Sequence, residues 1–247
     1  MTLSRCFPKP SKLFSFLRRI RSHVYWGLMG AVHQVVGTRL YEKKWASRAM
    51  ESDQVISNVE HPHRHWLLNQ FDALVPFSSV LEFGCGYGAN VQLLARRFSD
   101  VEVVGLDINP IAIREGNARL AQLGIERARL ILGKGDDLSQ FGDRSIDVVF
   151  TDATLLYIGP DQIRTVISEM KRISRRALLF IELHGCPDSH SDAQGLGVHT
   201  PDGWVRDYRT LLNHFFDNNS IMLTKIPVDI WQTGRWPVWG YLVEVTL

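Results

Sequence analysis

The polar and apolar positions follow a regular rhythm from about residue 60 to residue 184. Short runs rich in Val, Ile, Leu and Phe predict strands at residues 79–83, 101–107, 129–133, 146–152 and 177–183. Apolar residues at helical spacing predict helices at residues 61–75 and 89–98, a third from Pro110 and a fourth from residue 159. Strands that alternate with helices form parallel sheets whose two faces are covered. The chain therefore predicts a doubly wound α/β sheet.

The rhythm changes after residue 184. Residues 185–203 are rich in Gly, Ser, Asp and His and predict a long loop or lid. A helix over residues 204–216 is expected next, followed by strands over residues 220–228 and 238–247. Because a turn joins these two strands, they predict an antiparallel pair at the sheet edge. The expected fold is a seven-stranded, mostly parallel sheet with an antiparallel C-terminal hairpin.

Charge is distributed unevenly along the chain. Residues 1–45 hold nine Lys or Arg and one acid, a net charge of +8, while the remainder has a net charge of −6. Residues 11–37 place apolar residues at helical spacing beside several arginines, but their apolar stretch falls short of the ~20 residues that span a bilayer. The pattern fits either an amphipathic helix on an anionic membrane surface or a helix packed on the body with a solvated basic face.

The three cysteines are widely separated and have no CxxC spacing. This number and spacing suit neither a disulfide framework nor a zinc site, so we expect a reducing compartment and no bound metal. The expected location is the cytoplasm, with peripheral contact at the inner membrane face if residues 11–37 bind lipid. The sequence gives no indication of oligomeric state.

The stretch VLEFGCGYG, residues 80–88, ends a predicted strand in a glycine-rich turn before a predicted helix. Such a turn aims backbone N–H groups at a ligand above the sheet edge, and Gly84, Gly86 and Gly88 let that ligand approach closely. The next predicted strand ends in Asp107, where a carboxylate can accept both hydroxyls of a ribose. Together these features predict a nucleoside-containing ligand.

The identity of the nucleoside depends on Glu82. Gly84, Gly86 and Ala89 also fit the GxGxxG/A dinucleotide fingerprint, so the glycines permit NAD. A carboxylate two residues before the first glycine would repel a pyrophosphate but attract a ligand with an ammonium and a sulfonium group. Glu82 therefore favours S-adenosylmethionine over NAD.

Three successive stretches, VLEFGCGYG, GLDIN and IDVVFTDATLLYI, resemble motifs of the class I S-adenosylmethionine-dependent methyltransferases. The resemblance covers roughly residues 60–184 and agrees in motif order and spacing. It implies a Rossmann-like domain over residues 59–247, preceded by a basic helical extension over residues 1–58. It also implies S-adenosylmethionine as cofactor and S-adenosylhomocysteine as product.

The resemblance further implies roles for individual residues. The loop from Glu82 to Gly88 would hold the methionine portion, with Glu82 near the amino group. Asp107 would take the ribose hydroxyls, and Ile108 would pack against the adenine. Two further implied contacts lie at the ends of later strands: Asp136 near the adenine, where Lys134 occupies the position of the family's usual acid, and Thr151 with Asp152 beneath the methionine chain.

Three further residues are candidates from their positions in the pattern. Arg64, in the motif HPHR, could pair with the cofactor carboxylate, or it could be a solvated residue of the first helical turn. Tyr157 and His184 follow predicted strands four and five and are candidate catalytic residues. His184 titrates near neutrality and could act as a general base, or it could satisfy loop backbone groups.

The leading hypothesis is methyl transfer to a small molecule. Short likenesses of HPHR and DGWVRDYRTLL to bacterial small-molecule and glycan-modifying methyltransferases favour a hydroxyl of a sugar, a lipid-linked glycan or a secondary metabolite. Three alternatives stay open: an NAD-dependent oxidoreductase, a nucleic-acid methyltransferase and a non-catalytic partner subunit. TDAT after the fourth strand lacks an aromatic wall for a flipped base, which disfavours a nucleic-acid substrate.

Overall fold

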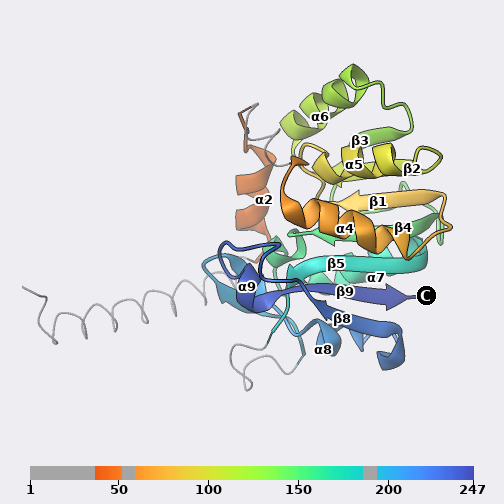
Figure 1. The fold of residues 1–247 in the computed structure, drawn as a ribbon. Coiled ribbons are helices and arrows are strands. Elements are labelled where there is room, and N and C mark those ends of the chain that lie inside the picture. Colours follow the sequence, from red (N-terminus) through yellow and green to blue (C-terminus); the bar gives the residue numbers. More distant parts are fainter. Residues whose placement is uncertain (1–36, 52–58, 186–193) are drawn as a thin grey trace, which may run out of the picture.

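The computed structural model describes residues 37–51, 59–185 and 194–247. A seven-stranded sheet forms the centre of the molecule, with strand order β3-β2-β1-β4-β5-β9-β8 (Figure 1). In chain order the strands are β1 (Ser79–Phe83), β2 (Glu102–Asp107), β3 (Ala128–Leu132), β4 (Ile146–Asp152), β5 (Ser174–Leu183), β8 (Ile221–Lys225) and β9 (Gly240–Thr246). The first five are parallel, and β9 pairs antiparallel with both β5 and β8. The predicted seven-stranded sheet is confirmed.

Helices cover both faces of the sheet. One face packs against α4 (Pro62–Asp72), α5 (Ala89–Arg97) and α6 (Pro110–Gln122), and the other against α7 (Ile163–Ile173) and α8 (Tyr208–Leu212). Strand side chains alternate between the two faces, so Val80 joins one buried cluster and its neighbour Leu81 the other. Burial on both faces explains the continuous apolar runs in the sequence.

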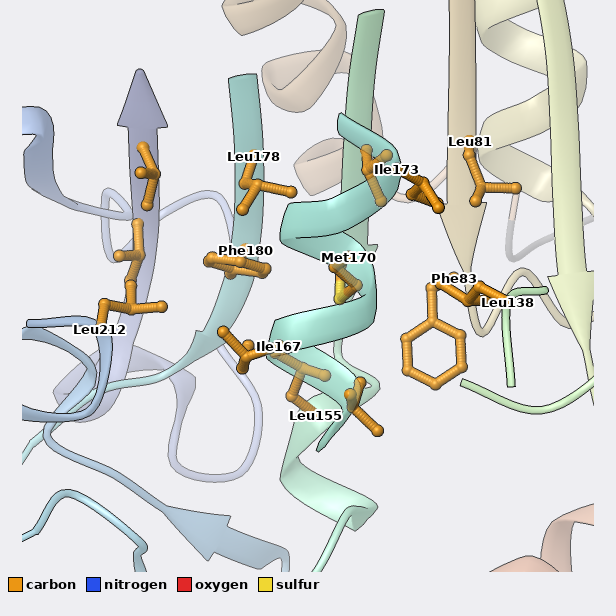
Figure 2. Packing of buried hydrophobic residues seen from close by; sticks show 14 of the residues in the cluster. Leu81, Phe83, Leu138, Leu155, Ile167, Met170, Ile173, Leu178, Phe180 and Leu212 are labelled. Carbon is orange, nitrogen blue, oxygen red and sulfur yellow. The ribbon is translucent and has the colours of Figure 1, made fainter. Parts of the chain in front are cut away.

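Helix α7 shows how its sequence specifies its position. Its buried residues recur at helical spacing, and Figure 2 shows Ile167, Met170 and Ile173 on the side that meets the sheet. Leu178 and Phe180 of β5 lie opposite them. The last turn of α7 carries Lys171 and Arg172, where positive charge is favourable at a helix C-terminus. The packing of α7 on the sheet therefore helps to fix the position of β4 and β5, whose carboxyl ends lie at the edge where the site forms.

The region after residue 184 differs from its prediction. Val198–Thr200 and Gly203–Val205 form a two-stranded hairpin, β6 and β7, within the expected loop. The predicted helix over residues 204–216 is wrong at its start, because Trp204 and Val205 are buried in that hairpin. Asp207 then accepts the backbone N–H of Thr210 and begins the short helix α8.

The N-terminal extension lies mostly outside the described residues. This includes nearly all of residues 11–37, so the expected membrane contact stays a prediction. Within residues 37–51, α2 (Arg39–Ala46) is the helix of the extension that the structure describes. Among the described helices, none is long and apolar enough to cross a membrane.

Candidate active site

The glycine-rich turn after β1 adopts the conformation that its sequence suggests. Gly84, Gly86 and Gly88 all have positive φ angles, of 78°, 52° and 78°. A Cβ on Gly84 would lie 2.3 Å from the side chain of Thr154, so this position requires glycine for packing. A Cβ on Gly86 would meet no atom within 4 Å. Gly86 therefore borders open space in which a ligand can approach the backbone.

That open space is a cavity at the carboxyl ends of β1, β2 and β4, with room of about 190 Å³ for water-sized molecules. Of the residues singled out from the sequence, seven line it: Gly84, Gly86, Asp107, Ile108, Asp136, Asp152 and Tyr157. Ligands of doubly wound sheets bind at this edge, where the chain connections diverge. The cavity thus lies where the sequence predicts a nucleoside.

Asp107 is positioned by backbone groups on both sides. Its Oδ2 accepts the N–H of Gly86 at 2.8 Å, and its Oδ1 accepts the N–H of Asn109 at 2.9 Å. Burial raises the pKa of its carboxyl above the ordinary value, although these N–H donors act in the opposite direction. The carboxylate is thereby held at the cavity wall in a fixed orientation.

Glu82 lies behind this wall. Its side chain is buried at the end of β1, and its Oε1 accepts a hydrogen bond of 2.6 Å from the amide of Asn90. Burial raises the pKa of its carboxyl to about 8, so Glu82 is largely protonated at neutral pH. Glu82 does not line the cavity. The anionic group that the sequence argument assigned to Glu82 must therefore come from another residue.

Asp152, at the end of β4, supplies that group. Its Oδ2 accepts hydrogen bonds of 2.9 Å from His63, Arg64 and Asn90. Burial acts to raise the pKa of Asp152, but His63, Arg64 and Asn90 outweigh it and hold the pKa below its ordinary value. Its Oδ1 is buried and has no hydrogen-bond partner among the described residues. Asp152 lines the cavity as an ionised carboxylate.

A pair of histidines supports Asp152 from outside the cavity. His63, buried in α4, bonds to Asp152 through Nε2 and to His61 through Nδ1. The ring of Trp231 stacks on His63 at a centroid distance of 4.0 Å. The sequence argument missed both histidines because only the tertiary structure brings HPHR beside β4. The repeated histidines of that motif were the available signal.

Comparison with known proteins shows what the part of the chain that carries this site is similar to. Residues 80–177, from β1 into β5, match the family model described as a methyltransferase domain.

Residues 80–177 therefore carry the sequence pattern of a methyltransferase domain.

Individual relatives and solved structures agree with this domain. The chain is 31% identical over 147 residues to an uncharacterized methyltransferase of Synechocystis, covering 58% of this chain and 65% of that protein. It is 24% identical over 181 residues to the malonyl-[acyl-carrier protein] O-methyltransferase of Priestia megaterium, covering 68% and 63%. Phosphoethanolamine N-methyltransferase 1 of Haemonchus contortus shares the fold, with a TM-score of 0.60, 16% identity, and coverage of 88% of this chain and 50% of that chain. The chain thus spans less than two thirds of the length of these two curated relatives.

Two predicted site residues of the methyltransferase domain lie elsewhere than expected. Arg64 donates to Asp152 and to the side-chain oxygen of Asn90, at 2.9 and 2.7 Å, and does not line the cavity. His184 also lies off the cavity, and its Nδ1 accepts the backbone N–H of Tyr208 at 3.2 Å. Burial lowers the pKa of His184. Arg64 thus contacts a carboxylate of the protein, and His184 contacts a loop backbone group, which is the second of the two roles expected for it; the catalytic and cofactor roles stay predictions.

Tyr157 lies on the cavity wall of the domain, in a short 3-10 helix, Leu155–Tyr157, after β4. The buried carboxylate of Glu182 accepts the backbone N–H groups of residues 154–156. It also accepts the hydroxyl of Thr151, which lies behind the cavity. At the other end of the turn, the buried Arg206 donates to the carbonyl oxygens of Leu155 and Ile158. Burial raises the pKa of Tyr157 to about 12, so its phenol is neutral.

The wall beyond Ile108 contains Asp136 and Lys134. Lys134, which the sequence placed where related domains carry an acid, pairs with Glu42 of α2 at 3.2 Å. Within residues 37–51, 59–185 and 194–247, no group of three or more His, Cys, Asp or Glu could hold a metal ion. Three carboxyl groups, those of Asp107, Asp136 and Asp152, line the cavity.

Proposed function

We propose that this protein transfers a methyl group from S-adenosylmethionine to a hydroxyl of a small molecule. A sugar, a lipid-linked glycan or a secondary metabolite is the proposed acceptor. The methyltransferase domain supports the reaction class, and the cavity at its strand ends supports a nucleoside cofactor. S-adenosylmethionine, when bound, supplies an activated methyl group on a cationic sulfur.

The observation that carries this proposal is the ionised carboxylate of Asp152 on the cavity wall. Arg64 donates to one of its oxygens, and the carboxylate, with Asp107, keeps this part of the wall anionic. S-adenosylmethionine carries an ammonium and a sulfonium, and both suit this wall. A dinucleotide would instead bring a pyrophosphate toward Asp107 and Asp152, which would repel it. The carboxylates therefore favour the sulfonium cofactor over NAD.

The positions of other cavity residues support the remaining contacts that we propose for the cofactor. Asp107 takes the ribose hydroxyls, Gly84 and Gly86 face the methionine portion, and Ile108 and Asp136 lie on the adenine side. Each of these residues lines the cavity. Glu82, Gly88, Thr151 and Arg64 act from behind it: they shape the loop or orient Asp152.

The acceptor end of the cavity is aromatic. Tyr41, Trp45 and Tyr157 line it, and the ring of Tyr157 lies 5.2 Å from that of Tyr41 and 4.8 Å from that of Trp45. Aromatic faces suit the apolar surface of a sugar ring or a metabolite. The neutral phenol of Tyr157 can orient an acceptor hydroxyl for in-line transfer, which is the main contribution needed from the protein.

Methyl esterification of a carboxylic acid is a second candidate. Arg48 also lines the cavity, and its guanidinium lies 4.6 Å from the Trp45 ring centroid. A cation at the mouth of the cavity would favour an anionic acceptor. One relative in the comparisons is named a malonyl-[acyl-carrier protein] O-methyltransferase.

Methyl transfer from tritium-labelled S-adenosylmethionine separates these candidates. The full chain is incubated with a low-molecular-mass metabolite extract and, separately, with total RNA. Label in a base-stable small-molecule product supports transfer to a hydroxyl, whereas label released by base as methanol indicates an ester. Label in RNA alone would contradict a small-molecule acceptor.

A further inference from the structure

Residues 38–50 form a strap across the cavity. The strap contains α2, which lies beyond the ends of the central strands in Figure 1. None of the residues of α2 is buried, yet Tyr41, Glu42 and Trp45 all line the cavity. A helix packed on a core buries an apolar stripe. The strap instead covers a hollow, and its apolar contact with the body includes the rings of Tyr41 and Trp45 against Tyr157.

One end of the strap is anchored in the body of the protein. Thr38 is buried, with 1% of its surface exposed. Its hydroxyl donates to the carboxylate of Asp161 at 3.1 Å and accepts the N–H of Gly159 at 2.9 Å. The anchor lies on the segment that leads into α7. The strap is therefore fixed at its beginning, and its remaining length depends on other contacts.

Asn109 fastens the far end. Its amide nitrogen donates to the carbonyl oxygens of Trp45 and Arg48, at 3.0 and 2.7 Å. Asn109 itself is 5% exposed and follows the cofactor-facing Asp107 by two residues. Its backbone N–H donates to Asp107, and its side-chain oxygen caps α6. Asn109 thus contacts the carboxylate of Asp107, the first turn of α6 and the strap.

Besides a hydrogen bond of 2.8 Å between the phenol of Tyr41 and Nε2 of His199 in β6, two further polar tethers reach the strap from the loops after β1 and β3. The phenol oxygen of Tyr87 accepts the N–H of Met50 at 2.9 Å. Lys134 pairs with Glu42, an exposed contact of modest strength. Tyr87, Asn109 and Lys134 lie in the loops after β1, β2 and β3. All three loops border the cavity, so a ligand in it contacts the same loops that hold the strap.

We propose that Asn109 is a positioning residue that closes the strap over the cofactor and so sets how long the cofactor stays bound. This inference rests on the proposed function. Cofactor exchange requires the tethers to break while the Thr38 anchor holds, a local opening of a few weak contacts. A ligand held by Asp107 stabilises the loop of Asn109 and with it the closed strap.

The substitution Asn109→Asp tests the hydrogen bonds from Asn109 to the strap without removing the N-cap of α6. Asn109→Asp keeps the oxygen that caps α6 and loses the donor to the two strap carbonyls. S-adenosylhomocysteine is the probe, and its dissociation rate is measured by stopped-flow fluorescence with the full chain. The rate should rise roughly tenfold in this variant and roughly threefold in Tyr87→Phe and Lys134→Met, as expected for lost hydrogen bonds and a lost surface ion pair.

Trypsin provides a second readout that a purely structural role would not change. Lys43, Lys44 and Arg48 of the strap are exposed. Saturating S-adenosylhomocysteine should slow cleavage after these residues in the wild type and protect them less in the tether variants. The matched control is Arg97→Met, which breaks an exposed ion pair with Asp72 away from the cavity and should change neither readout.

The outcomes separate this inference from the proposed function. If the wild type does not bind S-adenosylhomocysteine, both fail. If it binds but the dissociation rate and protection are unchanged in all three tether variants, the strap role is overturned and the proposed function stands. If Asn109→Asp melts at a lower temperature without ligand, Tyr87→Phe and Lys134→Met decide the question.

Discussion

Glu82 is the last residue but one of β1, and Asp152 is the last residue of the neighbouring β4. Both accept a hydrogen bond from the amide of Asn90, yet their pKa values move in opposite directions. Both carboxyls are buried, so desolvation acts on both. His63 and Arg64 donate to Asp152, and this direct pairing keeps Asp152 ionised. Glu82 receives the single bond from Asn90 and retains its proton. Two acids side by side thus supply one charge to the cavity.

This difference predicts how stability depends on pH. The pKa of Glu82 is raised from 4.5 to about 8 in the folded protein, so its contribution is fully present below 4.5 and is lost as pH rises through about 8. Glu82→Gln keeps an oxygen for Asn90 but cannot ionise. We expect the variant to gain on the order of 4 kcal/mol relative to the wild type between about pH 5 and about pH 9. Urea unfolding at the two pH values measures this change.

Glu102→Gln is the control, because Glu102 is exposed at the start of β2. Its stability relative to the wild type should be the same at both pH values. The buried carboxyl of Glu182, whose pKa burial raises to about 7, is present in all three proteins and cancels from the comparison. An equal pH dependence in Glu82→Gln and the wild type would show that Glu82 is ionised in the folded state.

The sequence was sufficient to predict the positions of residues that lie at the ends of strands or in the turns that follow them. Gly84 and Gly86 follow a strand, and Asp107 ends the next one, so pattern and spacing were sufficient to put them at one sheet edge. Arg64 and His184 were misplaced because their partners come from distant segments. The Arg64 partner, Asp152, is 88 residues away along the chain. Such pairings follow from packing, which a single sequence does not specify.

At the scale of elements, the turn that carries Tyr157 is held from both ends. Glu182 accepts three consecutive backbone N–H groups of the turn, and Arg206 donates to carbonyl oxygens at its other end. A short 3-10 helix has little stability of its own. Buried charged side chains on β5 and after β7 therefore fix the aromatic wall of the cavity.

Removing the Glu182 carboxylate should destabilise the protein strongly. Glu182→Ala leaves the N–H groups of residues 154–156 and the hydroxyl of Thr151 buried without an acceptor, which should cost about 3 kcal/mol or more. Thermal unfolding measures the loss as a lowered Tm. Glu102→Ala, at an exposed position of β2, should shift Tm by far less. Equal shifts in the two variants would contradict the bracing role.

The strands were predicted more accurately than the short elements. Strands β1 and β4 match their predicted bounds, because buried parallel strands have continuous apolar runs. The hairpin of β6 and β7 was missed because each strand has three residues. Strands this short are too short to show an alternation of polar and apolar residues, so only their pairing identifies them. Helix α8 is correspondingly shorter than predicted.

At the scale of the whole molecule, the position of the strap depends on the loops around the cavity, and the position of those loops depends on the sheet. The two buried clusters fix the strand ends, the strand ends place Asp107 and Asp152, and the loops beyond them hold the strap. The fold followed from sequence patterns, and so did the position of Asp107 and the glycine turn at one edge of the sheet. The tethers of the strap did not, because they join it to loops that are distant from it in the sequence.

The central claim is that the cavity binds an adenosyl ligand through Asp107, and calorimetric titration of S-adenosylhomocysteine tests it most directly. We expect binding to the wild type and a loss of roughly 10- to 100-fold in affinity for Asp107→Asn, because one charged acceptor for the ribose hydroxyls is lost. NADH, titrated in parallel, should not bind. Unchanged S-adenosylhomocysteine affinity in Asp107→Asn, or tighter binding of NADH than of S-adenosylhomocysteine, would contradict the account.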